Sequence, residues 1–277
     1  MALDDPDHFV ALKARYGDQP RPAHIAWNAT IASQLAHRSV RAYLPGPLPD
    51  GTIETLVAAA QSAPSSSNLH LWSVVAVTDL DLRSRLAVLA RNQRHIEEAP
   101  LILLWVADLA RAHEIGQLHD EPTEATDYLE TFLTAVLDAG LAAQSAAIAA
   151  ESLGLGTVFI GALRNHPEEV ASLIGLPTKS FVVFGLVVGT PDPSRATAVK
   201  PRPAQSIVLH HDRYGAAAAA RDAIDAYDDA TRTFQADQNQ PETGWVAPFL
   251  ARLAGASALS GRDRLRDALA ARGMPLL

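Results

Sequence analysis

The segment HRSVR carries a concentrated set of chemically capable side chains. It places His37, Arg38 and Arg41 around the hydroxyl of Ser39, within five residues. Guanidinium and imidazole groups beside a hydroxyl suit a phosphate or another anionic group, because they donate charge-assisted hydrogen bonds. The same cations at the C-terminal end of a helix would complement its dipole without any ligand. The residues alone leave both interpretations open.

Two further loops carry polar groups. PSSSN places three consecutive hydroxyls before an apolar run, and NQRHI offers a glutamine amide. Serine and asparagine in such a loop can contact a ligand, or they can bond their own backbone in a turn. The glutamine could face a ligand or solvent. The candidate residues in these loops are Ser65, Ser66, Ser67 and Gln93.

The segment KPRP holds two more cations, Lys200 and Arg202, apart by prolines. Proline fixes φ and so lowers the entropic cost of holding neighbouring side chains in place. A rigid pair of cations could form an anion site, and it could equally protect the edge of a strand against aggregation. The pattern by itself favours neither interpretation.

The composition narrows the classes of partner. The 277 residues carry a formal net charge of −8 with a pI near 5.6, which opposes broad binding to nucleic acid or anionic lipid. The absence of cysteine excludes disulfides and cysteine-ligated metal, and we expect no metal site. The apolar runs are too short to span a bilayer, and the acidic N-terminus does not resemble a signal peptide. We therefore expect a cytoplasmic protein with small-molecule partners, no nucleic acid and no membrane.

Three familiar enzyme signatures fail on spacing or context. The glycines at 156–161 follow a predicted helix and precede a strand, the reverse of a dinucleotide-binding loop. His113 and His119 would lie about 120° apart on a helix, so with Glu114 they do not form a zinc-protease motif. Residues 255–259 lack the closing glycine of a nucleophile elbow. None of these enzyme classes is indicated.

The periodicity of apolar residues predicts helices and a few strands in irregular order. Asn28 is a suitable cap for the first helix and Asp50 for the second. The run at 124–153 is rich in alanine and leucine, which predicts a long helix buried on most of its surface. Such a helix could also lie between two subunits. The predicted helices are 28–37, a segment opening at 49–51, 80–91, 124–153, 167–174 and polar helices after 214. The predicted strands are 72–78, 101–107, 157–161, 180–189 and 206–210.

These strands are too few for a doubly wound parallel sheet. The pattern predicts instead an α+β fold with a small sheet flanked by long helices. Residues 1–26 mix charges and prolines without periodicity, so we expect an N-terminal extension. The remainder, 27–277, is expected to form a single domain.

Taken in order, the motifs HRSVR, PSSSN, NQRHI, LGLGTVFIGALRN and VKPRP resemble the FMN-dependent nitroreductase family. The resemblance is to its NADPH-flavin oxidoreductase, or oxygen-insensitive nitroreductase, branch. Each motif is short, but the five follow one another in the family's order over about two thirds of the chain. The resemblance implies a nitroreductase-like fold, with a small mostly antiparallel sheet wrapped by helices and a helical C-terminal excursion. It also implies an intertwined homodimer with an exchanged terminal strand.

The resemblance assigns the cationic motifs to one end of an FMN molecule. His37, Arg38 and Ser39 would meet its phosphate and ribityl chain, and Lys200 and Arg202 would grip the phosphate.

The remaining motifs would lie at the flavin ring. Arg41 would tune the flavin near N1 and O2, and no side chain need act as a nucleophile or general base. Gln93 would bond the pyrimidine edge, and the serine loop would contact the flavin in part from the opposite subunit. The segment packed on the ring would comprise Phe159, Ile160, Gly161 and Ala162.

The implied activity is an FMN-dependent NAD(P)H oxidoreductase that reduces nitroaromatics, quinones or related acceptors. Hydride would pass through flavin N5 in a ping-pong cycle. The alternative is a flavin reductase or flavin-binding protein that supplies reduced FMN with little nitro turnover. The branch's basic cluster for NADPH is replaced here by QADQNQPETGW, with Arg232 as the nearby cation, so NADH is an expected donor as well.

Overall fold

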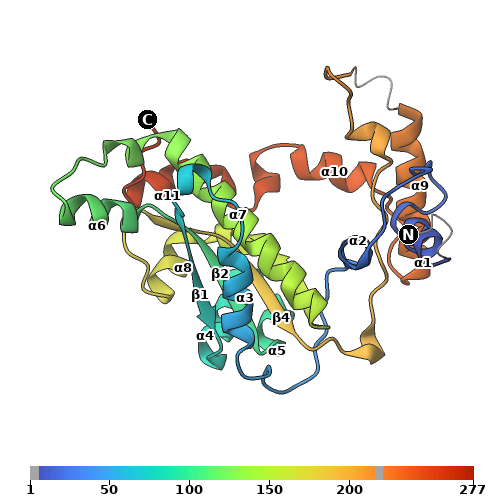
Figure 1. Ribbon diagram of the computed structural model, residues 1–277, viewed down its shortest axis with the longest axis horizontal. Coiled ribbons are helices and arrows are strands. Elements are labelled where there is room, and N and C mark those ends of the chain that lie inside the picture. Colours follow the sequence, from blue (N-terminus) through green and yellow to red (C-terminus); the bar gives the residue numbers. More distant parts are fainter. Residues whose placement is uncertain (1–5, 216–220) are drawn as a thin grey trace. The chain divides into compact units, whose positions relative to one another are not determined.

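The computed structural model describes residues 6–215 and 221–277, which divide into two compact units (Figure 1). The larger unit comprises 39–196 and 259–277, and the smaller comprises the residues up to 38 together with 197–258. This division does not coincide with the expected boundary at residue 26, because the extension associates with the chain that follows residue 196.

The larger unit is built on a four-stranded antiparallel sheet in the order β1-β2-β4-β3. The central strand β2 (Leu101–Asp108) is apolar on both faces, as predicted, since Leu103 and Leu104 join different buried clusters. The other strands are β1 (Trp72–Val77), β3 (Gly156–Ile160) and β4 (Ser180–Gly189). The expected α+β class with a small antiparallel sheet is thereby confirmed.

Helices cover both faces of this sheet. The helices α3 (Thr52–Gln61) and α7 (Leu129–Ser152) contact each other and bury their apolar residues with one face (Figure 1). The opposite face is covered by α4 (Leu80–Leu89), α5 (Arg94–Glu98) and α8 (Pro167–Leu173). Two further helices of this unit are α6 (Ala110–Leu118) and α11 (Leu265–Ala271).

The long predicted helix is confirmed as α7, whose small residues pack inward. Ala139, Ala142 and Ala146 are fully buried, because alanine lets a helix approach a sheet closely. By length and composition α7 is long and apolar enough to cross a membrane. The core helix of a globular unit meets the same criteria, and 44% of the most apolar 18-residue window of α7 is buried.

The smaller unit is helical in its described residues. It contains α1 (Pro6–Tyr16), α2 (Ala29–Leu35), α9 (Arg221–Asp237) and α10 (Val246–Leu253). Asn28 caps α2 as predicted, its side-chain oxygen accepting a hydrogen bond from the N–H of Ile31 at 2.9 Å. Leu12 and Tyr227 are among its buried side chains.

Two local predictions are wrong. Residues 206–210 form no strand; a 3-10 turn occupies Gln205–Ile207, and the exposed Val208 and Leu209 have no sheet to pack on. The N-cap of α3 is Gly51 rather than Asp50, because the chain enters that helix with a φ of 78° that glycine tolerates. The expected exchange of a terminal strand with a partner subunit stays a prediction.

Candidate cofactor site

The middle of HRSVR is fixed to the edge strand of the sheet. Ser39 lies opposite Thr157 as a parallel bridge, and the N–H of Val40 donates to the carbonyl of Thr157 at 2.9 Å. A side chain at Gly156 would place its Cβ 2.7 Å from that of Val40, which no real contact tolerates. Gly156 therefore allows the close approach of this segment to β3.

This anchoring places the exposed Arg41 beside the N-terminal end of α5. Burial, and then the charge of Arg41, lower the pKa of His95, which is nine-tenths buried. Burial raises the pKa of Tyr43, and Arg41 opposes that rise. The guanidinium of Arg41 is thus within electrostatic reach of a helix that begins directly after Gln93.

Gln93 ends a loop with an unusual backbone. Arg91 and Asn92 both have positive φ, 68° and 56°, a conformation that costs free energy for residues other than glycine. The side-chain Nε2 of Gln93 donates to the carbonyl of Ala90 at 2.8 Å. Its donor group is therefore used to hold the loop, and its Oε1 is the atom that could meet a ligand.

The C-terminal end of β3 carries the expected ring-packing segment. Phe159 is 38% exposed and meets Phe184 edge-on at 5.2 Å, whereas Ile160 is buried. A 3-10 turn then begins at Gly161 and contains Ala162. Since Ser39 is bridged to Thr157 of the same strand, HRSVR is held against the strand that leads into the segment 159–162, and its Arg41 is within electrostatic reach of His95 in NQRHI.

The serine loop is held by a residue that the sequence analysis did not single out. Asp138 lies in the middle of α7, is 2% exposed, and accepts hydrogen bonds from the hydroxyl of Ser65 at 2.8 Å and the N–H of Ser66 at 3.0 Å. Ser67 and Asn68 then adopt positive φ, 49° and 57°. One buried carboxylate thus restrains a loop that bears backbone strain.

A signal for Asp138 was present in the sequence. It is the single charged residue between Glu130 and Glu151 in an alanine-rich helix. A carboxylate in such a helix must be solvated or hydrogen-bonded, since burying it unpaired costs several kcal/mol. Its position alone does not reveal that the donors come from a loop more than sixty residues earlier in the chain.

Replacing Asp138 with asparagine should release this loop. The amide keeps the size of the carboxylate but has one acceptor oxygen, so we expect a loss of about 1–3 kcal/mol in stability from a buried donor left unpaired. The loop should become more susceptible to limited proteolysis near Ser66. Glu130→Gln, at an exposed position of the same helix, is the control and should change neither melting temperature nor cleavage. An unchanged cleavage pattern in Asp138→Asn would contradict this role.

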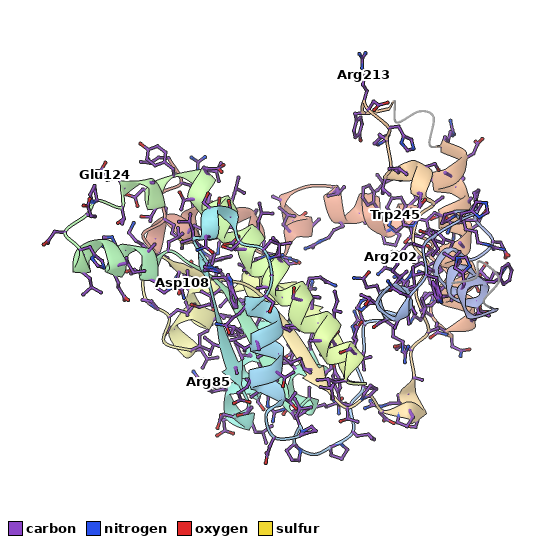
Figure 2. All side chains as sticks on the ribbon, viewed as in Figure 1. Arg85, Asp108, Glu124, Arg202, Arg213 and Trp245 are labelled. Atoms are coloured by element: carbon purple, nitrogen blue, oxygen red, sulfur yellow. The ribbon has the colours of Figure 1, made fainter. Side chains whose placement is uncertain are left out.

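In the smaller unit the first and last motifs meet through a third residue. The carbonyls of His37 and Lys200 both accept hydrogen bonds from the guanidinium of Arg15, at 2.7 and 2.9 Å. Arg38, Lys200 and Arg202 are exposed, and none of the three forms an ion pair with a carboxylate among the described residues; Figure 2 labels Arg202. The chain as a whole has a net charge of −8, yet these two motifs expose several cations. The backbone next to two of them, at His37 and Lys200, is held in place by Arg15.

The expected site residues fall into two groups, one in each unit. The chain passes from the smaller unit to the larger between Arg38 and Ser39, so HRSVR contributes residues to both. The group in the smaller unit carries cations suited to an anion, and the group in the larger unit carries hydroxyls, a cation, an amide and an aromatic edge.

Comparison with known proteins assigns two consecutive parts of the chain to one family. Residues 35–190 match the nitroreductase family, and residues 200–277 match the C-terminal domain of that family. An NADPH-flavin oxidoreductase from Vibrio harveyi is 38% identical over 232 residues, 83% of this chain and 93% of that protein. An FMN reductase [NAD(P)H] from Bacillus subtilis (strain 168) is 40% identical over 203 residues, 73% of this chain and 81% of that protein.

A solved structure shares the architecture. The structure of NfrA2 from B. megaterium superposes with a TM-score of 0.84 at 35% identity, covering 91% of this chain and 100% of that one. The expected fold and the expected resemblance are both confirmed. With sequence matches to both parts of the family and more than half of its residues in the first part alone, this chain belongs to the nitroreductase family.

Proposed function

We propose that this chain is an FMN-dependent NAD(P)H oxidoreductase that reduces nitroaromatics, quinones or related acceptors. The observation that carries the proposal is the hydrogen bond between Val40 and Thr157, which holds HRSVR against the strand that leads into the segment 159–162. The family membership and the relatives named as flavin and FMN reductases support it.

The donor set fits FMN at its phosphate end. Lys200, Arg202 and Arg38 supply positive charge, and guanidinium and ammonium groups bind phosphate through charge-assisted hydrogen bonds. The proline that follows each of Lys200 and Arg202 fixes the backbone between and after them, so little entropy remains to be lost on binding. These residues would therefore hold and orient the anionic end of the cofactor.

Other residues of the motifs carry groups suited to the flavin ring. FMN, when bound, supplies the two-electron chemistry between a nicotinamide and an acceptor. Arg41 would place a positive charge at the ring's pyrimidine edge, Gln93 would present its Oε1, and Phe159 would offer an apolar surface. The serine loop, held by Asp138, would limit where the ring can lie. None of these side chains is required to take a proton from the substrate.

Reconstitution tests this proposal directly. Protein freed of flavin and mixed with FMN should acquire an absorbance band near about 450 nm, as expected of a bound flavin. NADH or NADPH should bleach the band in a stopped-flow experiment, and menadione or nitrofurazone should restore it. Protein that neither retains nor binds FMN would overturn the proposal.

A second function is favoured by the names of the relatives, which are flavin and FMN reductases. In that case the chain would release reduced FMN to another acceptor and show little nitro turnover. Steady-state assays with free FMN and with nitrofurazone, each at saturating NAD(P)H, separate the two. A high rate with free FMN together with background nitrofurazone reduction would favour the flavin reductase.

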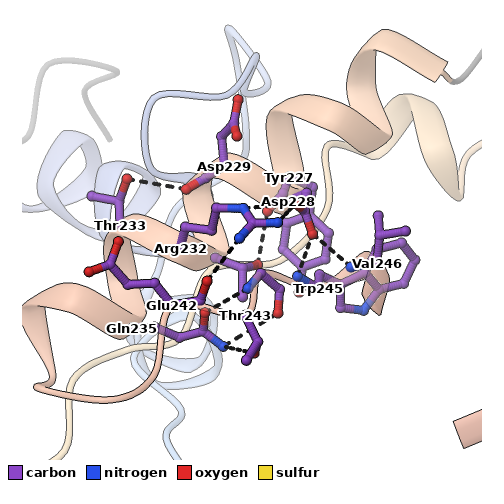
Figure 3. Close-up of polar contacts among 12 residues, drawn as sticks. Tyr227, Asp228, Asp229, Arg232, Thr233, Gln235, Glu242, Thr243, Trp245 and Val246 are labelled. Atoms are coloured by element: carbon purple, nitrogen blue, oxygen red, sulfur yellow. Dashed lines mark hydrogen bonds and ion pairs between the residues drawn. The ribbon is translucent and has the colours of Figure 1, made fainter. Parts of the chain in front are cut away.

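The choice of nicotinamide depends on the segment that follows α9. Figure 3 shows Arg232 bound to Asp228 through Nε and Nη2, at 3.1 and 2.9 Å, and to the carbonyl of Glu242 at 2.8 Å. Asp228 also accepts from the N–H groups of Trp245 and Val246 at the start of α10. The N–H of Val246, with smaller help from Trp245 and Arg232, lowers the pKa of Asp228 against the effect of burial. The nearby cation is thus committed to holding α10.

We therefore expect little preference for NADPH over NADH. A charge-assisted hydrogen bond contributes about 1.5–3 kcal/mol, and without one to the extra phosphate the ratio of kcat/KM for the two donors should stay below about tenfold. Arg232→Gln should leave this ratio unchanged while lowering the melting temperature. A ratio of about a hundredfold that collapses in Arg232→Gln would contradict the assignment.

We also propose a homodimer formed through α7. Leu129, Leu133, Leu137 and Leu141 recur at every fourth residue, so they lie along one stripe of the helix. They are 46–65% exposed in the single chain. A stripe of exposed leucines on the longest described helix is suited to pack against its own copy in a symmetric dimer. We expect such a dimer to work in the cytoplasm, where reduced nicotinamides are available.

A further inference from the structure

Arg15 of the N-terminal extension is a buried cation in the middle of the phosphate-binding segments. It is 5% exposed although it carries a full charge. Its Nη2 donates to the carbonyls of Leu35 and His37, both at 2.7 Å, and its Nη1 donates to the carbonyl of Lys200 at 2.9 Å. One planar group therefore holds the end of α2 and the KPRP segment together.

Arg15 and the KPRP segment each donate a hydrogen bond to the other. The N–H of Arg202 donates to the carbonyl of Arg15 at 2.8 Å. Gln19, which is 4% exposed, donates from Nε2 to the carbonyl of Arg202 at 3.1 Å. From the other side, the hydroxyl of Tyr227 on α9 reaches the carbonyl of Pro201 at 3.3 Å. Each residue from Lys200 to Arg202 thus has a backbone group bound to α1, to the segment after it, or to α9.

These contacts come from a part of the chain that lies outside the family match. The match begins at residue 35, after α1 and Gln19. The superposition with NfrA2 includes all of that chain but 91% of this one, so some residues of this chain have no counterpart in NfrA2. The anchoring of KPRP by α1 therefore comes from residues that precede the matched family region.

We propose that Arg15 is a positioning residue for the phosphate end of the cofactor, an inference that rests on the proposed FMN site. Its guanidinium is occupied by three carbonyls and is buried, so it orders the backbone that carries His37, Arg38, Lys200 and Arg202. Cations whose backbone is already ordered bind an anion with a smaller entropic loss than cations on mobile loops. The extension thereby raises the affinity for FMN through its phosphate and leaves the affinity for the ring unchanged.

Riboflavin is the probe that isolates this effect, because it has the same ring and ribityl chain without the phosphate. The dissociation constants of FMN and riboflavin for flavin-free protein are measured by quenching of flavin fluorescence. Arg15→Ala should raise the dissociation constant for FMN about tenfold or more and that for riboflavin less than about twofold, so the ratio between them shrinks. Circular dichroism and melting of each flavin-free variant establish that it is folded.

Two variants separate positioning from charge. Lys13→Ala removes an exposed cation from the same helix, one that pairs with Asp18, and should leave the ratio unchanged. Arg15→Lys keeps the charge but cannot hold three carbonyls at once, so the ratio should stay reduced. Full recovery in Arg15→Lys would show that charge alone matters, and would overturn the positioning role.

The remaining outcomes are also decisive. An equal loss of FMN and riboflavin in Arg15→Ala would indicate a general structural role and overturn the inference. A wild-type protein that binds FMN but does not prefer it over riboflavin would overturn the phosphate site and the inference together. An unchanged ratio of the two dissociation constants in Arg15→Ala would overturn the inference alone. Should Arg15→Ala not fold, Gln19→Met removes the contact to Arg202 and should shrink the same ratio by a smaller factor.

Discussion

Replacing Arg41 with alanine is expected to slow reduction of the bound cofactor by NADH or NADPH on the order of a hundredfold, the usual effect of removing one fixed group that stabilises developing charge. Arg41 is held beside the sheet edge by Val40 and reaches His95 electrostatically. Negative charge gathers at the pyrimidine edge when the cofactor accepts electrons, and a fixed cation there lowers its free energy. The two-electron reduction potential should fall by about 60 mV, the equivalent of that factor in rate.

Arg38→Ala is the matched control for this result. Arg38 lies three residues earlier, in the smaller unit, and is also exposed without an ion pair among the described residues. We expect its loss to weaken FMN binding and to leave the potential of the bound cofactor unchanged. Both variants are saturated with FMN before stopped-flow reduction and potentiometric titration. Equal reduction rates and equal potentials would show that HRSVR does not divide into a phosphate end and a redox end.

The cationic motifs and most of the sheet could be predicted from the sequence because their signals are local. An apolar run such as 101–107 predicts a central strand because neither of its faces carries polar side chains for water, and β2 is indeed buried on both faces. The cap Asn28 likewise acts on a residue three positions away. HRSVR and KPRP were each ambiguous alone, and their order along the chain supplied the interpretation.

The residues that could not be predicted act over long distances in sequence. Asp138 restrains a loop around residue 66, Arg15 holds residue 200, and Gly156 makes room for Val40. Each role depends on which backbone groups the fold brings near, and periodicity carries no information about that. The predicted strand at 206–210 failed for the same reason, since an alternating pattern forms a strand only where a neighbouring strand can pair with it.

Leu137→Glu is expected to convert the dimer to a monomer. Leu137 has the highest exposed fraction, 65%, of the four leucines along α7, which places it at the crest of the stripe. In a symmetric dimer the same patch meets its own copy, so one substitution introduces two carboxylates into an apolar contact. An uncompensated buried charge costs about 3–5 kcal/mol, which would raise the dissociation constant by at least about two orders of magnitude.

Light scattering coupled to size-exclusion chromatography measures this change as a fall in mass from twice 29.5 kDa to 29.5 kDa. Leu118→Glu is the matched control, because Leu118 is 80% exposed on α6 and lies outside the stripe; it should remain dimeric. If the serine loop contacts the flavin from the opposite subunit, the Leu137→Glu monomer should also bind FMN more weakly while its melting temperature without flavin changes little. A monomer that binds FMN as tightly as the dimer would place the whole cofactor site within one chain, and a dimeric Leu137→Glu would exclude α7 as the interface.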